Sequence, residues 1–280
     1  MKLQTLTDLS GCETSCKKSQ GGHLLPCSSE GYHTIPRKIP FLERTFPTAG
    51  FYSRLFLLVC QSSFQAKRGR YDDNTWGKSS LAVLRALERV GVTIEVTGAE
   101  HIEQFDTPCV IIGNHMSLLE TLVLPCIIQP VRKVTFIVKE SLLHYPIFRH
   151  VMRSRNPIAV GRDNPRHDLR TVLEGGVDRL NRGISIIVFP QTTRTTSFDP
   201  AGFNSIGVKL AQKAGVPIIP AALLTDAWEN GKYFKDLGKI NPAKKVRFAF
   251  GEPIWVSGRG SAEHQAIIRF IGGKLEDWGR

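Results

Sequence analysis

The sequence predicts an α/β fold in which a largely parallel sheet is covered by helices on both faces. Two observations carry this prediction. Short runs rich in Val, Ile and Phe recur from residue 92 onward, and longer amphipathic runs separate them. Continuous apolar runs are typical of strands buried on both faces, and regular alternation of strand and helix implies parallel strands joined by crossover helices.

The elements follow in order along the chain. The predicted helix that follows residue 112 begins at Ser117, because Ser117 and Glu120 have the spacing of a capping box. The next predicted helix opens at Asn164 and Pro165, a typical N-cap and first-turn pair, and Gly183 ends it. The predicted strands are 92–96, 109–112, 134–138, 184–189, 218–224 and 246–250, and the predicted helices are 117–128, 165–182, 203–214 and 261–278.

We expect three segments in the chain. Residues 1–50 show no sustained periodicity and are predicted to be disordered, residues 51–90 form an amphipathic helical segment, and residues 91–280 form the α/β domain. Phe51, Leu55, Leu58 and Val59 fall on one helical stripe. This stripe either lies in a membrane interface or packs on the domain's own core. The apolar run 51–64 is shorter than the roughly 20 residues that a membrane-spanning helix needs.

The charge limits the possible partners. A net charge of +12 and a pI near 9.6 indicate a polyanionic partner, which could be nucleic acid, an anionic membrane surface or a phosphorylated substrate. No RNA-binding signature or zinc-finger spacing is present, so no nucleic-acid partner is expected. The scattered cysteines fit reduced thiols in a cytosolic compartment. Cys12, Cys16, Cys27, His23 and His33 fit no common metal-site spacing, and no metal is expected.

The turn after residue 112 carries the strongest candidate for chemistry. His115 lies between a predicted buried strand and a predicted helix, and Glu120 lies in the first turn of that helix. Five residues on a continuous helix would separate the two side chains by roughly 140°. They meet only if His115 folds back over the helix N-terminus. The alternative is that Glu120 only caps the helix and that His115 is an ordinary turn residue.

Two further turns carry polar side chains that could bind an anion. Arg162 precedes the helix that opens at Asn164, where a phosphate would meet a guanidinium and free backbone N–H groups. In the stretch 189–195, Pro190 blocks extension of the strand, and Arg194 is surrounded by Gln191, Thr193 and other hydroxyl side chains. In both cases the alternative is a solvated surface arginine.

These turns together resemble the motifs of the glycerophospholipid acyltransferases, the 1-acylglycerol-3-phosphate acyltransferase family. The first motif, NHxxxxD, corresponds to Asn114-His115 through Glu120. The second motif, an arginine near a strand end, corresponds to Arg162, and the third motif, FPEGTRS, corresponds to residues 189–195. A fourth motif similar to VPIIPV is found at 216–221, and the resemblance covers roughly residues 90–256.

The resemblance implies an enzyme that moves a fatty acyl group from acyl-CoA or acyl carrier protein to the hydroxyl of a lysophospholipid, above all 1-acylglycerol-3-phosphate. His115 would act as the general base and Glu120 would orient it, in the manner of a Ser-His-Asp triad whose serine is replaced by the substrate hydroxyl. No cofactor is implied. The protein would be peripheral or monotopic on the cytoplasmic face of a membrane, and residues 91–280 would form the acyltransferase domain.

The resemblance further implies that Arg162, Gln191, Thr193 and Arg194 bind the acceptor. This sequence departs from the family pattern at three positions. Glu120 replaces Asp, and residues 191 and 192 replace the Glu and Gly of the third motif. The acceptor could therefore be a different lysolipid or an amino-lipid hydroxyl. Another alternative is a membrane lipid-binding protein without catalytic activity.

Overall fold

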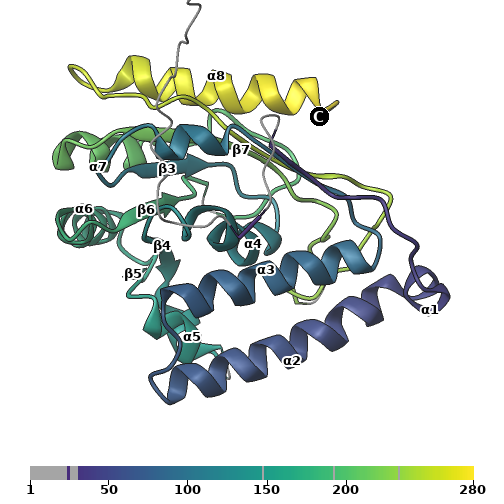
Figure 1. Cartoon of the computed structure of the whole chain (residues 1–280). Coiled ribbons are helices and arrows are strands. Elements are labelled where there is room, and N and C mark those ends of the chain that lie inside the picture. The colour runs from purple at the N-terminus through teal and green to yellow at the C-terminus, as the bar shows by residue number, and fades with distance from the viewer. Residues whose placement is uncertain (1–23, 26–30, 147, 192, 233) are drawn as a thin grey trace, which may run out of the picture.

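The computed structural model describes residues 24–25, 31–146, 148–191, 193–232 and 234–280. The chain forms a mixed α/β fold around an eight-stranded sheet with the order β1-β2-β8-β7-β3-β6-β4-β5 (Figure 1). The strands are β1 (Tyr32–His33), β2 (Ile94–Thr97), β3 (Val110–Gly113), β4 (Val134–Lys139), β5 (Ile158–Val160), β6 (Ser185–Val188), β7 (Ile218–Leu224) and β8 (Val246–Phe250).

The α-helices cover both faces of this sheet. They are α1 (Phe41–Thr45), α2 (Pro47–Lys67), α3 (Asp73–Arg89), α4 (Leu119–Ile128), α5 (Arg149–Ser154), α6 (Pro165–Asn181), α7 (Ile206–Ala214) and α8 (Ser261–Asp277). In Figure 1, α2 and α3 lie on the side of α4, and α6, α7 and α8 lie on the opposite side. The predicted elements from residue 92 onward are all found, with ends that differ by a few residues.

The sheet is largely parallel, as predicted, and its direction changes at two places. The parallel pairs are β2–β8, β7–β3, β3–β6, β6–β4 and β4–β5, and the antiparallel pairs are β1–β2 and β7–β8. The block from β7 to β5 therefore runs in one direction, and β2 and β8 run in the other. The strands of the first block therefore end at the same edge of the sheet as β3.

Two hydrophobic clusters lie on the two sides of the sheet. Along β3, Ile111 belongs to the cluster under α2, α3 and α4, whereas Val110 and Ile112 belong to the cluster under α6, α7 and α8. All three side chains are buried. This alternation arises because successive side chains of a strand point to opposite faces, and it explains why the strand sequence is a continuous apolar run.

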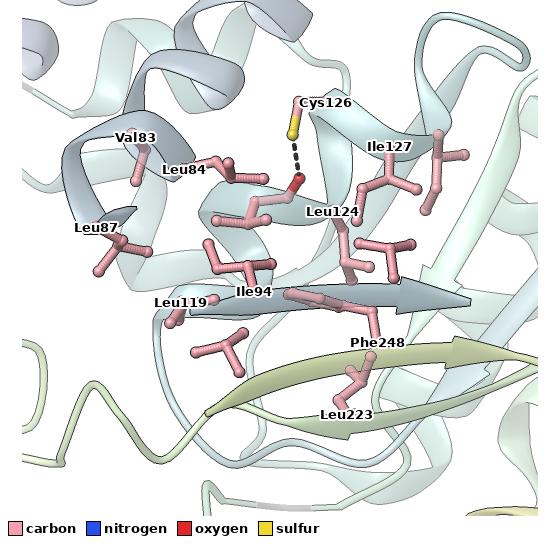
Figure 2. Close-up of a cluster of buried hydrophobic side chains, with 14 of the residues drawn as sticks. Val83, Leu84, Leu87, Ile94, Leu119, Leu124, Cys126, Ile127, Leu223 and Phe248 are labelled. Atoms are coloured by element: carbon pink, nitrogen blue, oxygen red, sulfur yellow. Dashed lines mark hydrogen bonds between the residues drawn. The ribbon is translucent and has the colours of Figure 1, made fainter. Parts of the chain in front are cut away.

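The first cluster joins the N-terminal helices to the α/β domain. Figure 2 shows Leu84 and Leu87 of α3 and Leu124 of α4 near Ile94 of β2 and Phe248 of β8. These side chains are almost fully buried. A fully buried leucine contributes about 1.5–3 kcal/mol relative to an exposed one. α3 is therefore a part of the core rather than a separate layer.

Helix α2 is apolar on two sides. On the side that was predicted as a single stripe, Phe51 and Leu55 are buried, and Leu58 and Val59 pack against the core. The core-packing alternative is therefore the correct one for this stripe. The other side of α2, together with α1, carries large exposed apolar side chains. We call this surface the outer face, and its members are Phe41, Leu42, Phe46, Phe56, Leu57 and Phe64.

The described part of residues 1–50 includes β1 and α1. The side chain of Tyr32 in β1 donates a hydrogen bond to the Glu88 carboxylate of α3 at 2.5 Å, which ties β1 to the core. The predicted disorder of residues 1–23 and 26–30, and the cysteines there, lie outside the described residues. Within the described ranges, no helix is long and apolar enough to span a membrane, and no cluster of His, Cys, Asp and Glu could hold a metal ion.

Candidate active site

Three strand ends meet at one edge of the sheet. β3 pairs in parallel with β6 and with β7, so the residues after Gly113, Val188 and Leu224 emerge side by side. The first of these turns carries His115, and the second carries the stretch 189–195. The sequence placed each of these two turns just past the end of a predicted strand, and it did not identify the third.

Asn114 extends the pairing of β3 and β7 beyond their backbone ladder. Its Nδ2 donates to the carbonyl oxygen of Leu223 at 2.8 Å, and its Oδ1 accepts from the Leu223 N–H at 2.8 Å. The side-chain amide thus supplies the donor and the acceptor that a further strand residue would supply. Because Asn114 is buried and doubly bonded, the chain must turn at this point, and His115 leaves the sheet in a fixed direction.

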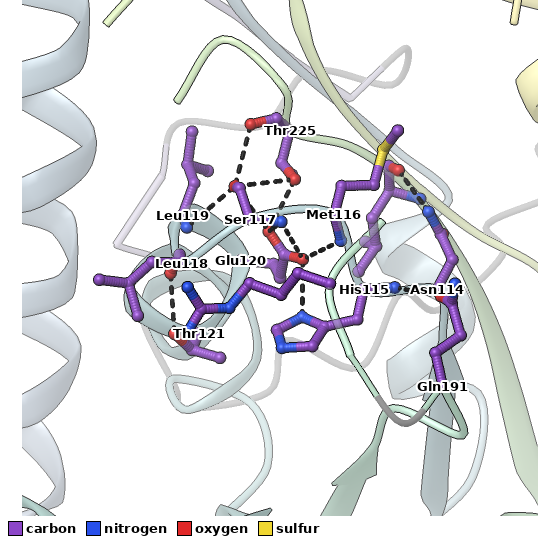
Figure 3. Close-up of polar contacts among 12 residues, drawn as sticks. Asn114, His115, Met116, Ser117, Leu118, Leu119, Glu120, Thr121, Gln191 and Thr225 are labelled. Carbon is purple, nitrogen blue, oxygen red and sulfur yellow. Dashed lines mark hydrogen bonds and ion pairs between the residues drawn. The ribbon is translucent and has the colours of Figure 1, made fainter. Parts of the chain in front are cut away.

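His115 folds back over the N-terminus of α4 and contacts Glu120 (Figure 3). Its Nδ1 lies 2.9 Å from Glu120 Oε1. An ionised carboxylate can only accept, so Nδ1 carries the proton and donates it. The opposite ring nitrogen, Nε2, is then a lone-pair acceptor that points away from Glu120. The His115 side chain is 15% exposed, and the Glu120 side chain is fully buried.

The Glu120 carboxylate accepts several other hydrogen bonds. Its Oε1 receives the N–H of Met116 at 2.6 Å and that of Ser117 at 3.0 Å, and its Oε2 receives the Thr225 hydroxyl at 2.6 Å. Ser117 Oγ accepts from the N–H of Leu119, as a capping serine does. The assigned helix begins at Leu119, two residues later than predicted. Glu120 therefore makes the capping contact and the histidine contact at the same time, and the two alternatives do not exclude each other.

The pKa of Glu120 lies below its usual range despite complete burial. Burial alone raises the pKa, because it penalises the charged form. The hydrogen bond and the charge of His115, the Thr225 hydroxyl and the Ser117 N–H outweigh that effect. The carboxylate is consequently ionised at neutral pH and can stabilise an imidazolium on His115.

The turn after β6 holds the other side of His115. The ring of Phe189 stacks on the imidazole, with centroids 4.4 Å apart and an interplanar angle of 6°. Gln191, which was predicted to bind substrate, accepts the backbone N–H of His115 at 2.6 Å and donates to the Thr195 hydroxyl at 2.9 Å. Its buried side chain thus joins the two turns. An amide suits this position because one end accepts while the other donates.

Arg194 and Thr193 both contact the segment after β7. Arg194 Nη1 forms an ion pair with Asp236 Oδ1 at 2.6 Å, and the Thr193 hydroxyl accepts from Lys235 Nζ at 3.1 Å. The Arg194 side chain is only 17% exposed. The predicted anion-binding arginine is therefore present at this edge of the sheet, and a carboxylate of the same chain already contacts it.

Arg162 lies at the end of β5, on the same edge of the sheet but farther from His115. Two strands, β6 and β4, separate β5 from β3. At the usual strand spacing their ends are about 14 Å apart. The expectation of free backbone donors here is wrong. The N–H groups of Gly161 and Arg162 both donate to the Asp168 carboxylate, and the Asn164 side chain caps α6.

Sequence reasoning missed two residues of the site. Thr225 donates to Glu120 from 105 positions away, and Asp236 pairs with Arg194 from 42 positions away. Neither lies in a recognisable motif. The only available signal for Thr225 was its position directly after the predicted strand 218–224, which is where the parallel topology places a residue beside His115.

Comparisons with known proteins find similar acyltransferases. A family model described as "Acyltransferase" matches residues 93–224. The chain is 28% identical over 193 residues to a 1-acyl-sn-glycerol-3-phosphate acyltransferase from Pseudomonas aeruginosa, covering 69% of this chain and 70% of the relative. It is also 28% identical over 130 residues to a chloroplastic 1-acyl-sn-glycerol-3-phosphate acyltransferase from Brassica napus, covering 46% of this chain and 37% of that protein.

The fold is similar to that of a solved structure. The crystal structure of the 1-acyl-sn-glycerophosphate acyltransferase PlsC from Thermotoga maritima aligns with a TM-score of 0.61 at 22% identity, over 85% of this chain and 97% of that chain. These findings support the resemblance to the 1-acylglycerol-3-phosphate acyltransferase family and an O-acyltransferase of that type. The resemblance inferred from the four motifs and the expectation of an enzyme are thereby confirmed.

Proposed function

We propose that this enzyme transfers a fatty acyl group from a thioester, acyl-CoA or acyl carrier protein, to the free hydroxyl of 1-acylglycerol-3-phosphate. The observation that carries the proposal is the His115–Glu120 pair. Its Nδ1 is held by a buried carboxylate at 2.9 Å, and its Nε2 is left to accept a proton at the edge of the sheet. The names of the relatives supply the acceptor class.

The reaction needs no acyl-enzyme. Nε2 of His115 takes the proton of the acceptor hydroxyl while the hydroxyl oxygen attacks the thioester carbonyl carbon. The tetrahedral intermediate collapses with loss of the thiolate, and the imidazolium returns its proton to the sulfur. The products are an ester and a free thiol. Glu120 stays ionised throughout and stabilises the imidazolium, as the aspartate of a Ser-His-Asp triad does.

The acceptor phosphate is proposed to bind Arg194, with Arg162 contributing from the end of β5. A guanidinium matches the geometry of a phosphate and keeps its charge at any working pH. Gln191 is proposed to act through His115, whose backbone it holds. Thr193 lies exposed beside Arg194 and offers a hydroxyl to the same headgroup.

A second acceptor class has one observation in its favour. Asp236 lies 2.6 Å from Arg194 and could receive the amine of an amino-lipid headgroup. A thiol-release assay with acyl-CoA separates the two classes. We expect turnover with lysophosphatidate and little with a lysolipid that carries an amine, and His115→Ala should abolish it. Faster turnover of the amino-lipid acceptor would reverse the assignment.

We also propose that residues 51–90 bring the enzyme to an anionic membrane, from which residues 91–280 take the acceptor. Within this segment, the outer face exposes Phe56, Leu57 and Phe64 of α2, with exposed fractions of 62%, 67% and 55%. Exposed Lys67 and Arg68 follow at the end of the helix. Apolar side chains beside basic ones suit the interface of an anionic bilayer.

Flotation with liposomes tests this surface. The variant Leu57→Ser, Phe64→Ser should lose binding to vesicles that contain phosphatidylglycerol, because about 25 cal/mol per Å² of apolar burial is lost with those side chains. The matched control is Leu84→Ser, which alters a buried residue of α3 and should lower stability instead. Unchanged flotation of the double variant would contradict the proposal.

A further inference from the structure

The described residues 229–232 and 234–239 lie beside the acceptor side of the site, where Lys235 contacts Thr193 and Asp236 contacts Arg194. The N–H of Glu229 donates to the carbonyl oxygen of Lys239 at 2.9 Å, which closes the neck of the loop. A Cβ atom on Gly238 would lie 1.6 Å from the Glu229 carbonyl oxygen. Only glycine, which has no Cβ atom, allows the two backbone segments to approach this closely at the neck.

The backbone of the loop is fixed near its neck. The hydroxyl of Tyr52 in α2 donates to the carbonyl oxygen of Gly238 at 2.8 Å, and the indole N–H of Trp228 donates to the Tyr52 hydroxyl at 3.0 Å. Tyr52 and Trp228 also pack edge to face. These contacts hold the backbone at Gly238 and at Asp236, whose carbonyl oxygen lies 3.4 Å from the Tyr52 hydroxyl.

The side chain of Asp236 is the more exposed partner of its ion pair. It is 36% exposed, whereas that of Arg194 is 17% exposed. An ion pair with one exposed partner is weak, because water competes for the carboxylate and because salt screens the pair. Asp236 can therefore leave Arg194 for solvent at small cost, while Arg194 stays in place.

A carboxylate and a phosphate bind a guanidinium in the same way, through anionic oxygens that accept N–H bonds. The two cannot occupy Arg194 together, since like charges at contact distance repel. A phosphate monoester carries about −1.5 to −2 charges near pH 7, more than the single charge of a carboxylate. Such an acceptor outcompetes Asp236, and a lipid without phosphate does not.

We propose that Asp236 is a placeholder for the acceptor's phosphate. It holds Arg194 in binding geometry in the acceptor-free enzyme and gives the guanidinium up when a phosphomonoester acceptor arrives. The inference rests on the proposed function, because it takes Arg194 as a phosphate ligand. Its consequence is that Asp236 weakens acceptor binding by the free energy of its own ion pair, and that removing its charge tightens binding.

The test compares the acceptor KM of Asp236→Asn and Asp236→Ala with that of the wild type, using lysophosphatidate and acyl-CoA. An exposed pair worth up to about 1 kcal/mol corresponds to about a fivefold lower KM, with kcat little changed. The gain should vanish when Arg194→Ala is added. The control Glu229→Gln removes a charge from the same loop, where Glu229 contacts Lys244 at 3.6 Å, and should leave KM unchanged.

The outcomes separate the inference from the function that it rests on. A wild-type enzyme that turns over lysophosphatidate, with an equal or higher KM in both Asp236 variants, overturns the inference alone. A gain that persists without Arg194 also overturns it. A wild-type enzyme that turns over only phosphate-free acceptors overturns both. Melting temperatures of the variants show whether a raised KM comes from lost structure.

Discussion

The turn after β3 and the turn after β6 lie next to each other, and they are stabilised in different ways. In the first turn, Glu120 is completely buried and accepts from backbone N–H groups, two hydroxyls and His115. In the second, Arg194 contacts a half-exposed aspartate from another loop. The groups that would perform the chemistry are thus rigid, and the groups that would bind the acceptor are adjustable.

The largest expected effect concerns the rigid turn. Glu120→Gln keeps the oxygen that accepts from the backbone of Met116 and Ser117, so the melting temperature should change by no more than a few degrees. It removes the charge that stabilises the imidazolium, and kcat should fall by about 10⁴, as it does when a triad aspartate becomes an amide. Thiol release measures kcat, and His115→Ala should be inactive.

One result would limit the assignment of Glu120, and a companion variant tests it from the other side. Near-wild-type turnover by Glu120→Gln, in an assay where His115→Ala is dead, would leave His115 acting alone. Glu120→Asp restores the residue of the family motif and should keep measurable activity, although its shorter side chain draws the carboxylate away from Thr225.

The next effect concerns Thr225, one of the two residues that sequence reasoning missed. Thr225→Val keeps the shape of the side chain but removes the hydroxyl that donates to Glu120 at 2.6 Å. Loss of a hydrogen bond to a buried charge should lower the free energy of unfolding by about 1.5–3 kcal/mol. We expect kcat to fall about tenfold, because a carboxylate that is less firmly held orients His115 less well.

Denaturant unfolding and turnover measure these two effects. The matched control is Thr121→Val, whose hydroxyl donates to the Leu118 carbonyl oxygen on the same helix without contacting Glu120. If Thr225→Val and Thr121→Val behave alike, Thr225 has no special role in the site.

Sequence alone predicted most of the fold because burial on both sides of the sheet leaves continuous apolar runs. It could not predict the direction of β8, because the residue pattern of a strand does not indicate whether the strand runs parallel or antiparallel to its neighbour. It also could not decide which side of α2 meets the core. Both sides of that helix are apolar, and only packing distinguishes buried Phe51 from exposed Leu57.

The candidate site was predictable where its residues are close in sequence. The spacing of His115 and Glu120 was sufficient, because a turn and a helix N-terminus bring them together. Contacts across the fold were not predictable. Asp236 pairs with Arg194, and the Asp168 carboxylate accepts from the backbone N–H groups before α6. Both contacts depend on loop conformations that no local sequence pattern indicates.

The third effect compares the two arginines of the acceptor side. Arg194→Ala should raise the acceptor KM by at least tenfold, because truncating a partly buried arginine–phosphate contact costs about 2–5 kcal/mol. Arg162 is exposed at the end of β5, so Arg162→Ala should raise KM less. Arg170→Ala is the control, since that side chain is exposed and pairs with Glu174 within α6. An unchanged KM in both test variants would refute the phosphate site.

The smallest effect is the pH dependence of stability, and it returns to the rigid turn. The pKa of Glu120 is lower in the folded protein than its ordinary value of 4.5, because the contacts with His115, Thr225 and Ser117 outweigh burial. A depressed carboxyl pKa contributes stability above the unfolded-state pKa, and that stability is lost as the pH falls through the folded-state pKa.

The wild type should therefore lose stability more steeply than Glu120→Gln as the pH is lowered from 5, since the amide does not titrate. Other carboxylates, such as Glu95 with its Lys245 and Arg247 partners, titrate in both proteins and cancel in the comparison. Urea unfolding at a series of pH values measures the difference, and Glu174→Gln on the exposed side of α6 serves as the control. Parallel curves for the wild type and Glu120→Gln would mean that the carboxylate is no better stabilised in the fold than in water. The hydrogen bonds that Glu120 accepts in the turn after β3 would then not stabilise its charge.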